Sequence, residues 1–142
     1  MSIYFLVGIC NLSIVHNIDR IARINPELAC VDHFYALQYA DFVLRDRFPE
    51  GEPAIATNAK SSYWYAYSVL HGPFLLGEKA IANDIEYSFC YALNIIKRKF
   101  ELGESTIAKD EYRSSRYTHE VLKQDFYLNG TLISSLFLTI QS

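Results

Sequence analysis

The octapeptide "GEKAIAND" at residues 77–84 has two close relatives in the same chain, "GEPAIATN" at 51–58 and "GESTIAKD" at 103–110. Successive copies start 26 residues apart, and this spacing extends beyond them. Three columns of identical residues keep the period, namely Phe48, Phe74, Phe100 and Phe126; Tyr39, Tyr65, Tyr91 and Tyr117; and Ile55, Ile81, Ile107 and Ile133. A fixed period of this length is typical of a repeat protein. The period divides the chain into units at 32–57, 58–83, 84–109 and 110–135.

Each unit is predicted to begin with a long helix. The units open with residue types whose side chains accept hydrogen bonds from the free N–H groups of a helix N-terminus, namely Asp32, Asn58, Asp84 and Asp110. Small residues, the Tyr column and aliphatic residues follow at offsets of 4, 7, 8 and 12, which lie on one helical face. Small side chains at two of these positions would let neighbouring helices approach closely. We expect long helices near 33–46, 59–72, 85–98 and 111–124.

A glycine and a second, shorter helix complete the pattern. After the glycine, the repeated "E-x-x-I-A" predicts short helices near 51–57, 77–83 and 103–109. Two helices in 26 residues are too small to bury their own apolar face, and stacking of successive pairs solves this problem. The predicted fold is therefore all-α, a short α-solenoid of helical-hairpin repeats. The fourth unit departs from the pattern at 127–134, where "YLNGTLIS" makes a short helix less secure.

Residues 1–142 are expected to form a single domain with two unlike ends. Residues 1–31 are interpreted as a divergent first unit that caps one end, and residues 136–142 as a tail. The stretch "LISSLFLTI" at 132–140 is unusually apolar for a terminus. It could fold back over the fourth unit or meet the same surface of a second chain, and we expect a homodimer. The contact residues predicted for this dimer are Leu136, Phe137 and Ile140.

The composition argues against several classes of protein. A formal net charge of −3 without a basic run disfavours nucleic acid as a partner. No apolar stretch is long enough to span a bilayer, so no membrane contact is expected. Cys10, Cys30 and Cys90 are odd in number and far apart, which favours a reducing, cytoplasmic location. Cys30 and His33 form "CVDH" without the further ligands of a zinc site, so neither a metal nor another cofactor is expected.

A glutamate recurs at the start of the short helices, as Glu52, Glu78 and Glu104. A catalytic carboxylate is needed once, whereas a structural contact is needed in every unit, so we interpret this column as structural. A Glu here complements the helix dipole and can accept hydrogen bonds from free N–H groups. The chain shows no histidine paired with a nucleophile and no nucleotide-binding fingerprint, so no catalytic residue is predicted.

The consensus of the units, "YxYAxxVLxxRFxxGExAIAxD", resembles tandem repeats in uncharacterised proteins encoded by tailed bacteriophages and other large DNA viruses. The likeness covers about 32–123 and is carried best by "YWYAYSVLHGPFLLGEKAIAND" at 63–84 and "RFPEGE" at 47–52. The fourth unit again departs from it, with Thr118 in place of Ala. The resemblance brings no activity or catalytic residues. It implies a context, a phage protein made in the cytoplasm of a bacterium and directed at a host or phage protein.

Function is expected in the columns that vary, because the shared columns hold the fold. The outward face of the long helices offers such columns, and the second unit presents Trp64, Tyr67 and His71 there. Trp and Tyr are enriched at binding hot spots. The alternative is that Trp64 only covers a groove between repeats. The predicted protein-binding residues are Trp64, Tyr67, His71, Arg45, Lys97, Arg116, His119 and Lys123.

One of the varying columns is nearly all basic, with Arg45, His71, Lys97 and Lys123. It could attract an acidic partner or a phosphate backbone, or it could simply place cations at helix C-termini. The predicted function is a non-catalytic protein-binding solenoid, a phage-encoded factor in host takeover or counter-defence. The first alternative is a nucleic-acid-associated protein that uses the basic column. The second is a small enzyme or nucleotide-binding protein, which would need a polar pocket that departs from the repeat symmetry.

Overall fold

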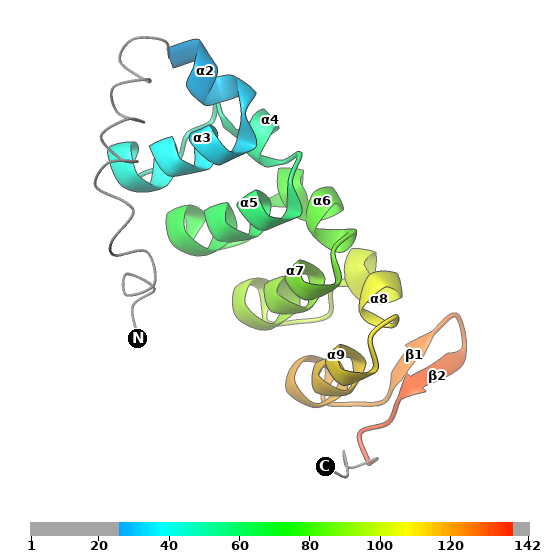
Figure 1. Ribbon diagram of the computed structural model, residues 1–142. Helices are drawn as coiled ribbons and strands as arrows, with labels where there is room; N and C mark the ends of the chain where they lie inside the picture. The colour runs from blue at the N-terminus through cyan, green and yellow to red at the C-terminus, as the bar shows by residue number, and fades with distance from the viewer. Residues whose placement is uncertain (1–25, 138–142) are drawn as a thin grey trace.

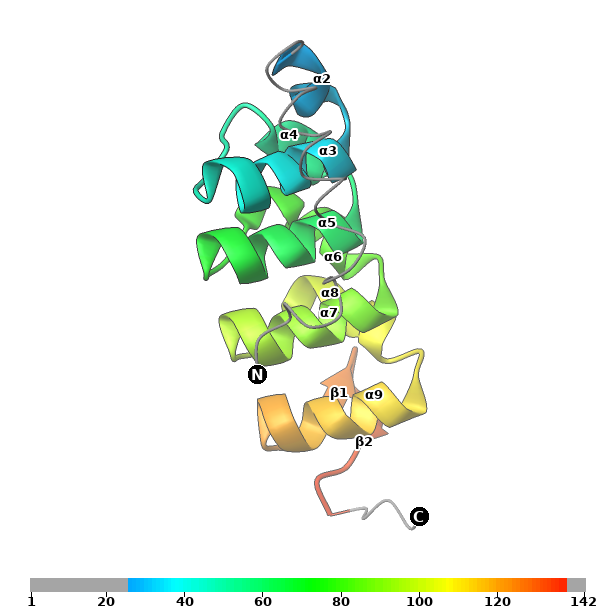
Figure 2. The same ribbon diagram turned by 60° about the vertical axis from the view of Figure 1, so that its left-hand side comes forward.

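The computed structural model describes residues 26–137, and residues 1–25 and 138–142 lie outside the described residues. The described chain is mostly helical and carries one two-stranded sheet near its C-terminal end. Figures 1 and 2 show the long helices lying side by side in chain order, with shorter helices in a second row beside them. The expectation of a mostly helical chain is confirmed. Of the expected cap unit at 1–31, only α2 (Pro26–Val31) is described.

Each long helix begins where the sequence predicts, because the side chain of its N-cap residue accepts hydrogen bonds from the first free backbone N–H groups. The side chain of Asp32 accepts hydrogen bonds from the backbone N–H groups of Phe34 and Tyr35. Asn58, Asp84 and Asp110 each accept one such bond from the third residue beyond them. The helices that follow consist of an α-helical half and a π-helical half. They are α3 (His33–Gln38) with η2 (Tyr39–Leu44), α5 (Ala59–Trp64) with η3 (Tyr65–Leu70), α7 (Ile85–Cys90) with η5 (Tyr91–Ile96), and α9 (Glu111–Arg116) with η6 (Tyr117–Leu122).

The long helices end two residues earlier than predicted. A residue with left-handed backbone geometry follows each one, with φ between 50° and 54°, at Arg45, His71, Lys97 and Lys123. Left-handed geometry ends a helix and is usually supplied by glycine. Since these positions hold His, Lys or Arg, nothing in the local sequence marked the stop. The wider π register was not predicted either.

The three predicted short helices are present with shifted bounds. They are α4 (Glu52–Ile55), α6 (Glu78–Ala82), which the 3₁₀ turn η4 (Leu75–Gly77) precedes, and α8 (Glu101–Ile107). Their glycines permit close approach to the long helix of the same unit. A Cβ added to Gly77 would lie 2.5 Å from Cδ1 of Phe74 and 2.6 Å from Cβ of Ser62. The close approach between helices therefore includes a contact inside each of the first three units, in which a small residue of the long helix faces a glycine.

The fourth unit lacks the short helix, at the place where its sequence departs from the pattern. In place of its short helix lies an antiparallel hairpin of β1 (Phe126–Leu128) and β2 (Thr131–Ser134). Asn129 and Gly130 form the turn, with φ of 50° and 80°. An Asn-Gly pair favours this two-residue hairpin turn because both residues tolerate positive φ. Local turn chemistry thus overrides the helical pattern in this unit.

The three shared columns form the core. Tyr65, Tyr91 and Tyr117 are fully buried, as are Ile55, Ile81 and Ile107. Each Tyr of the column packs edge-on or tilted against the Phe that follows it by nine residues, with ring centroids 5.0 to 5.2 Å apart. Such ring pairs add stability beyond their buried area. Ile133, which lies in the hairpin, is only partly buried but still packs against this core.

Candidate functional site

The Glu column binds the tyrosine hydroxyl of the following unit. Tyr65 donates its hydroxyl hydrogen to Oε1 of Glu52 at 3.0 Å and accepts the N–H of Phe48 at 2.8 Å. The same two bonds join Tyr91 to Glu78 and Phe74, and Tyr117 to Glu104 and Phe100. Burial of the hydroxyl, reinforced by the nearby carboxylate, raises the pKa of Tyr65 to about 12. The Glu side chains therefore link neighbouring units, and their partners are hydroxyls rather than the free helix N–H groups we expected.

Two of the three glutamates also hold a cation from their own unit. Nε of Arg47 lies 2.6 Å from Oε1 of Glu52, and Nη2 of Arg47 lies 3.1 Å from Oε2. This bond from the guanidinium keeps the pKa of Glu52 below its usual value. Nζ of Lys99 lies 3.5 Å from Oε2 of Glu104.

An aromatic cluster occupies the outward face of the second unit. Trp64 and Tyr67 contact each other edge-on with ring centroids 5.7 Å apart, and both rings contact Tyr63. Tyr63 in turn lies 5.5 Å from the ring of Tyr87 in the third unit. Trp64 is half-buried and Tyr67 is 39% exposed. We call Tyr63, Trp64, Tyr67 and Tyr87 the aromatic face.

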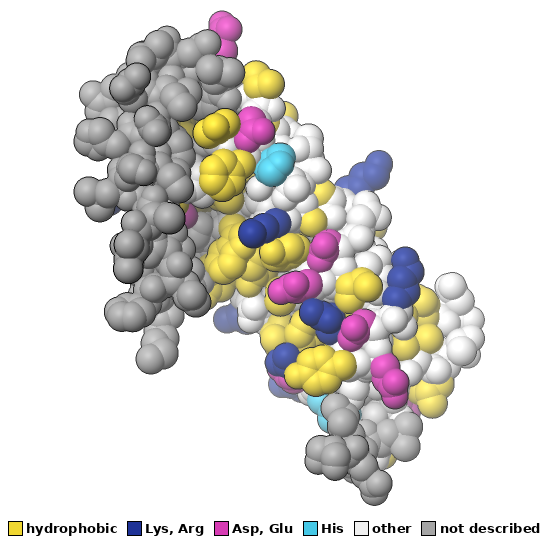
Figure 3. All heavy atoms as spheres, in the orientation of Figure 1, with side chains coloured by type: hydrophobic (Ala, Val, Ile, Leu, Met, Phe, Trp, Pro, Cys, Tyr) yellow, Lys and Arg dark blue, Asp and Glu magenta, His cyan; other side chains and the backbone are white. Residues whose placement is uncertain are grey.

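Polar contacts fix the base of this face. The amide of Asn94 donates to the hydroxyl of Tyr63 at 3.1 Å, and burial raises the pKa of that hydroxyl. Figure 3 shows hydrophobic side chains gathered over α5 and α7, with charged side chains around them. The rings are therefore held by packing in one arrangement while Tyr67 remains open to solvent. Trp and Tyr are residue types that are enriched at binding hot spots.

Arg116, another predicted binding residue, contacts both the third and the fourth unit. Arg116 lies over the ring of Phe89 at 5.0 Å and forms an ion pair with Glu120, so it continues the outward face into the fourth unit. Tyr112 beside it is 60% exposed.

The basic column gains a structural explanation. All four of its residues are exposed and occupy the left-handed stop of a long helix. Cations there meet the negative end of the helix dipole. Nδ1 of His71 lies 3.1 Å from the carbonyl oxygen of Tyr67, inside its own last turn. Through this contact His71 lies next to Tyr67 of the aromatic face.

The predicted dimer contact is partly tied back to the fourth unit. The N–H of Leu136 donates to Asp125 at 2.8 Å, and its carbonyl oxygen lies 2.9 Å from Nε2 of His119. His119, predicted to bind a partner, is thus engaged with the C-terminal segment. Phe137 is 86% exposed, and Ile140 lies outside the described residues. Leu136 and Phe137 therefore differ in their surroundings.

The described residues offer neither a metal site nor a reactive thiol at Cys90. Among residues 26–137, no group of three His, Cys, Asp or Glu side chains is arranged to hold a metal ion. Cys90 is half-buried, and burial raises the pKa of its thiol, which lowers its reactivity. Cys10 lies outside the described residues. No helix within the described part of the chain is long and apolar enough to cross a bilayer.

Sequence reasoning missed two members of the aromatic face, Tyr63 and Tyr87. Both lie in columns whose residue type varies between units, and "SSYWYAY" at 61–67 is the densest aromatic run in the chain. That density was the available signal. The neighbour relation of Tyr63 and Tyr87 depends on how two helices lie side by side, which no local pattern encodes.

Comparison of the chain with protein-family models, with curated proteins and with solved structures finds no match.

Proposed function

We propose that the chain is a short α-solenoid of 26-residue units that binds a protein partner through the aromatic face. The single observation that carries the proposal is the packed cluster around Trp64, in which Tyr67 remains 39% exposed. Large aromatic rings that are buried against a partner are among the side chains that contribute most to binding free energy at interfaces. Because the rings already pack against one another, little side-chain entropy is lost on binding.

The repeating contacts support the solenoid. The Tyr-to-Glu bond and the cap at the long helix recur with the 26-residue period. Tyr65, Tyr91 and Tyr117 each bond groups of the preceding unit, so these three units depend on a neighbour for a buried contact. Such dependence on the neighbouring unit supports a solenoid, whose units contact only their neighbours.

The proposed function is non-catalytic. The carboxylates that recur in the sequence are engaged in structural hydrogen bonds, which supports a binding role over a catalytic one. The proposed context remains that of a phage-encoded protein acting in the bacterial cytoplasm on a host or phage protein, in host takeover or counter-defence. This context rests on the repeat resemblance described above. The formal net charge of −3 gives no support to nucleic acid as the ligand.

The test compares capture by the natural chain and by a variant that carries Trp64→Ala and Tyr67→Ala. Tagged protein is incubated with bacterial lysate, and captured proteins are quantified by mass spectrometry. We expect the double variant to lose the specific capture. The matched control carries Lys79→Ala and Asn83→Ala, two exposed positions on and next to α6, and should capture as the natural chain does.

Thermal unfolding of the same proteins separates binding from stability. If the double variant loses much stability and still captures the partner, the rings belong to the core and the proposal is wrong. If both variants capture equally at unchanged stability, binding lies elsewhere.

A further inference from the structure

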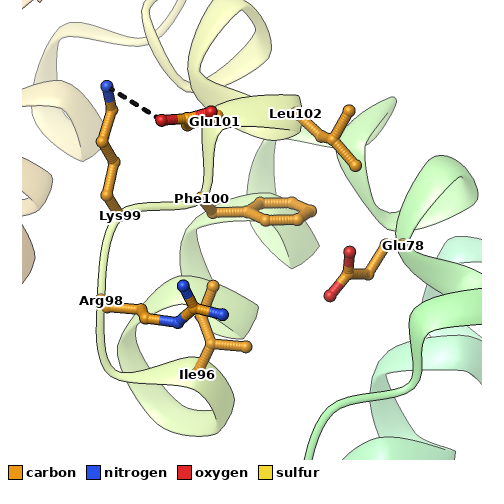
Figure 4. Close-up of a pocket in the computed structure, with 7 residues that line it drawn as sticks. All are labelled: Glu78, Ile96, Arg98, Lys99, Phe100, Glu101 and Leu102. Atoms are coloured by element: carbon orange, nitrogen blue, oxygen red, sulfur yellow. Dashed lines mark ion pairs between the residues drawn. The ribbon is translucent and has the colours of Figure 1, made fainter.

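A groove of about 330 Å³ lies between the second and third units, and its lining shares no residue with the aromatic face. It is lined by Glu78 at the start of α6 and by Ile96 and residues 98–102 of the following unit. Figure 4 shows Glu78 on one side, with Arg98 and Lys99 on the loop at the other side and the ring of Phe100 between them. Apolar side chains and charges of both signs therefore meet in one opening.

The corresponding glutamate in each neighbouring unit is paired with a cation of its own unit. In the first unit, Arg47 grips both carboxylate oxygens of Glu52. In the third unit, Lys99 lies within ion-pair distance of Glu104. In both units the cation comes from the position five residues before the glutamate.

The second unit lacks that cation. The position five residues before Glu78 is Pro73. Oε1 of Glu78 accepts the hydroxyl hydrogen of Tyr91 at 2.9 Å, as in the other units. Within residues 26–137, Oε2 of Glu78 has neither a hydrogen bond nor an ion pair. Figure 4 shows this carboxylate pointing into the groove.

We propose that this groove binds an arginine side chain of a protein partner, with its guanidinium on Glu78 in the place that Arg47 takes on Glu52. The contact of Arg47 with Glu52 is the precedent in the same chain. There a planar guanidinium donates to both oxygens of the carboxylate at the equivalent position. Leu102 is 60% exposed at the rim and would cover the methylene stem of the ligand. The site uses none of the residues of the aromatic face, so this inference stands independently of the proposed function.

The other charges of the groove leave Glu78 available. Lys99 is paired with Glu101 and Glu104, as the dashed line to Glu101 in Figure 4 illustrates. Arg98 lines the groove but is not within ion-pair distance of Glu78. Because Arg98 carries the same charge as the arginine ligand, Arg98→Ala removes a repulsion and should tighten binding.

The test titrates ¹⁵N-labelled protein with N-acetyl-arginine methylamide into the tens of millimolar and follows backbone amide signals. The control ligand, N-acetyl-citrulline methylamide, has nearly the same shape without the charge. We expect saturable shifts at residues 78 and 98–102 with the arginine compound only. Equal shifts with both compounds, or no saturable shift at these residues, would overturn the proposal.

Two variants test whether the arginine compound binds the carboxylate of Glu78. Glu78→Gln keeps an oxygen for the hydroxyl of Tyr91 and should weaken binding about fivefold, the upper range for a partly exposed ion pair. Pro73→Arg supplies the chain's own cation and should abolish binding while raising the thermal midpoint. The control Glu52→Gln should bind as the natural chain does, because Arg47 already occupies that site. Undiminished binding by Glu78→Gln contradicts the proposal even if Pro73→Arg does not fold.

Discussion

Removing one hydroxyl, with Tyr65→Phe, tests whether the Tyr-to-Glu contact joins the units. The ring and its packing against Phe74 stay, while the buried hydroxyl that accepts the Phe48 N–H and donates to Glu52 is lost. A buried donor left without a partner costs about 1–3 kcal/mol. Glu52 remains paired with Arg47, so the loss of its bond from Tyr65 costs less free energy than the unpaired N–H of Phe48 does. We expect a total destabilisation of about 2–3 kcal/mol.

Tyr39→Phe is the matched control for this change. Tyr39 belongs to the same column and packs on Phe48 with ring centroids 5.1 Å apart, but no described residue bonds its hydroxyl. Its replacement should cost less than about 0.5 kcal/mol. The two variants therefore share the chemical change and the ring contact, and they differ in the hydrogen bonds.

The assay is urea unfolding followed by circular dichroism, together with amide exchange at Phe48. Exchange is needed because a row of stacked units can unfold in segments, and a single midpoint would then hide a local effect. For a chain of this size, the thermal midpoint should fall by about 4–12 °C. Equal stability of the Tyr65→Phe and Tyr39→Phe proteins, with unchanged exchange at Phe48, would refute the reasoning.

Three further outcomes are expected. The pKa of Tyr65 is raised from 10 in the unfolded chain to about 12 in the folded one. The stability that this shift gives the folded chain is complete below pH 10 and is lost between pH 10 and 12. Unfolding at stepped alkaline pH measures this loss. Gly77→Ala should destabilise the chain by about 1–3 kcal/mol because the new Cβ meets Ser62, whereas Gly72→Ala, with its nearest atom at 3.8 Å, should change stability little in the same urea titration. If the apolar C-terminal end forms a two-fold dimer, light scattering at micromolar concentration gives twice the monomer mass and Phe137→Asp halves it, whereas a monomer mass that persists as concentration rises rules the dimer out.

The sequence by itself determined the period, the starts of the long helices and the core. Each of these has a local physical cause. A cap side chain bonds N–H groups two or three residues away, so Asp32 and its equivalents can be identified without knowing the fold. Apolar residues on one helical face must be buried, so the Tyr, Phe and Ile columns were bound to meet in a core. Because each of these patterns recurs every 26 residues, each could be recognised in the sequence.

Only the tertiary structure decided where the helices end and what their polar groups bind. The π register of the second half of each long helix and the left-handed stop at Lys97 and its equivalents depend on packing, since no glycine marks them. The hydroxyl of Tyr65 reaches Glu52 thirteen residues earlier only because successive units stack. The same stacking brings Tyr63 and Tyr87 together in the aromatic face.

The groove at Glu78 shows how the two kinds of information combine. The sequence contained Pro73 in the place of a cation, but nothing local gives that difference a meaning. The meaning appears once the folded chain shows Arg47 on Glu52 and Lys99 on Glu104. A hydrogen bond or ion pair between side chains is a property of distances in space, and the chain acquires those distances only when its units pack.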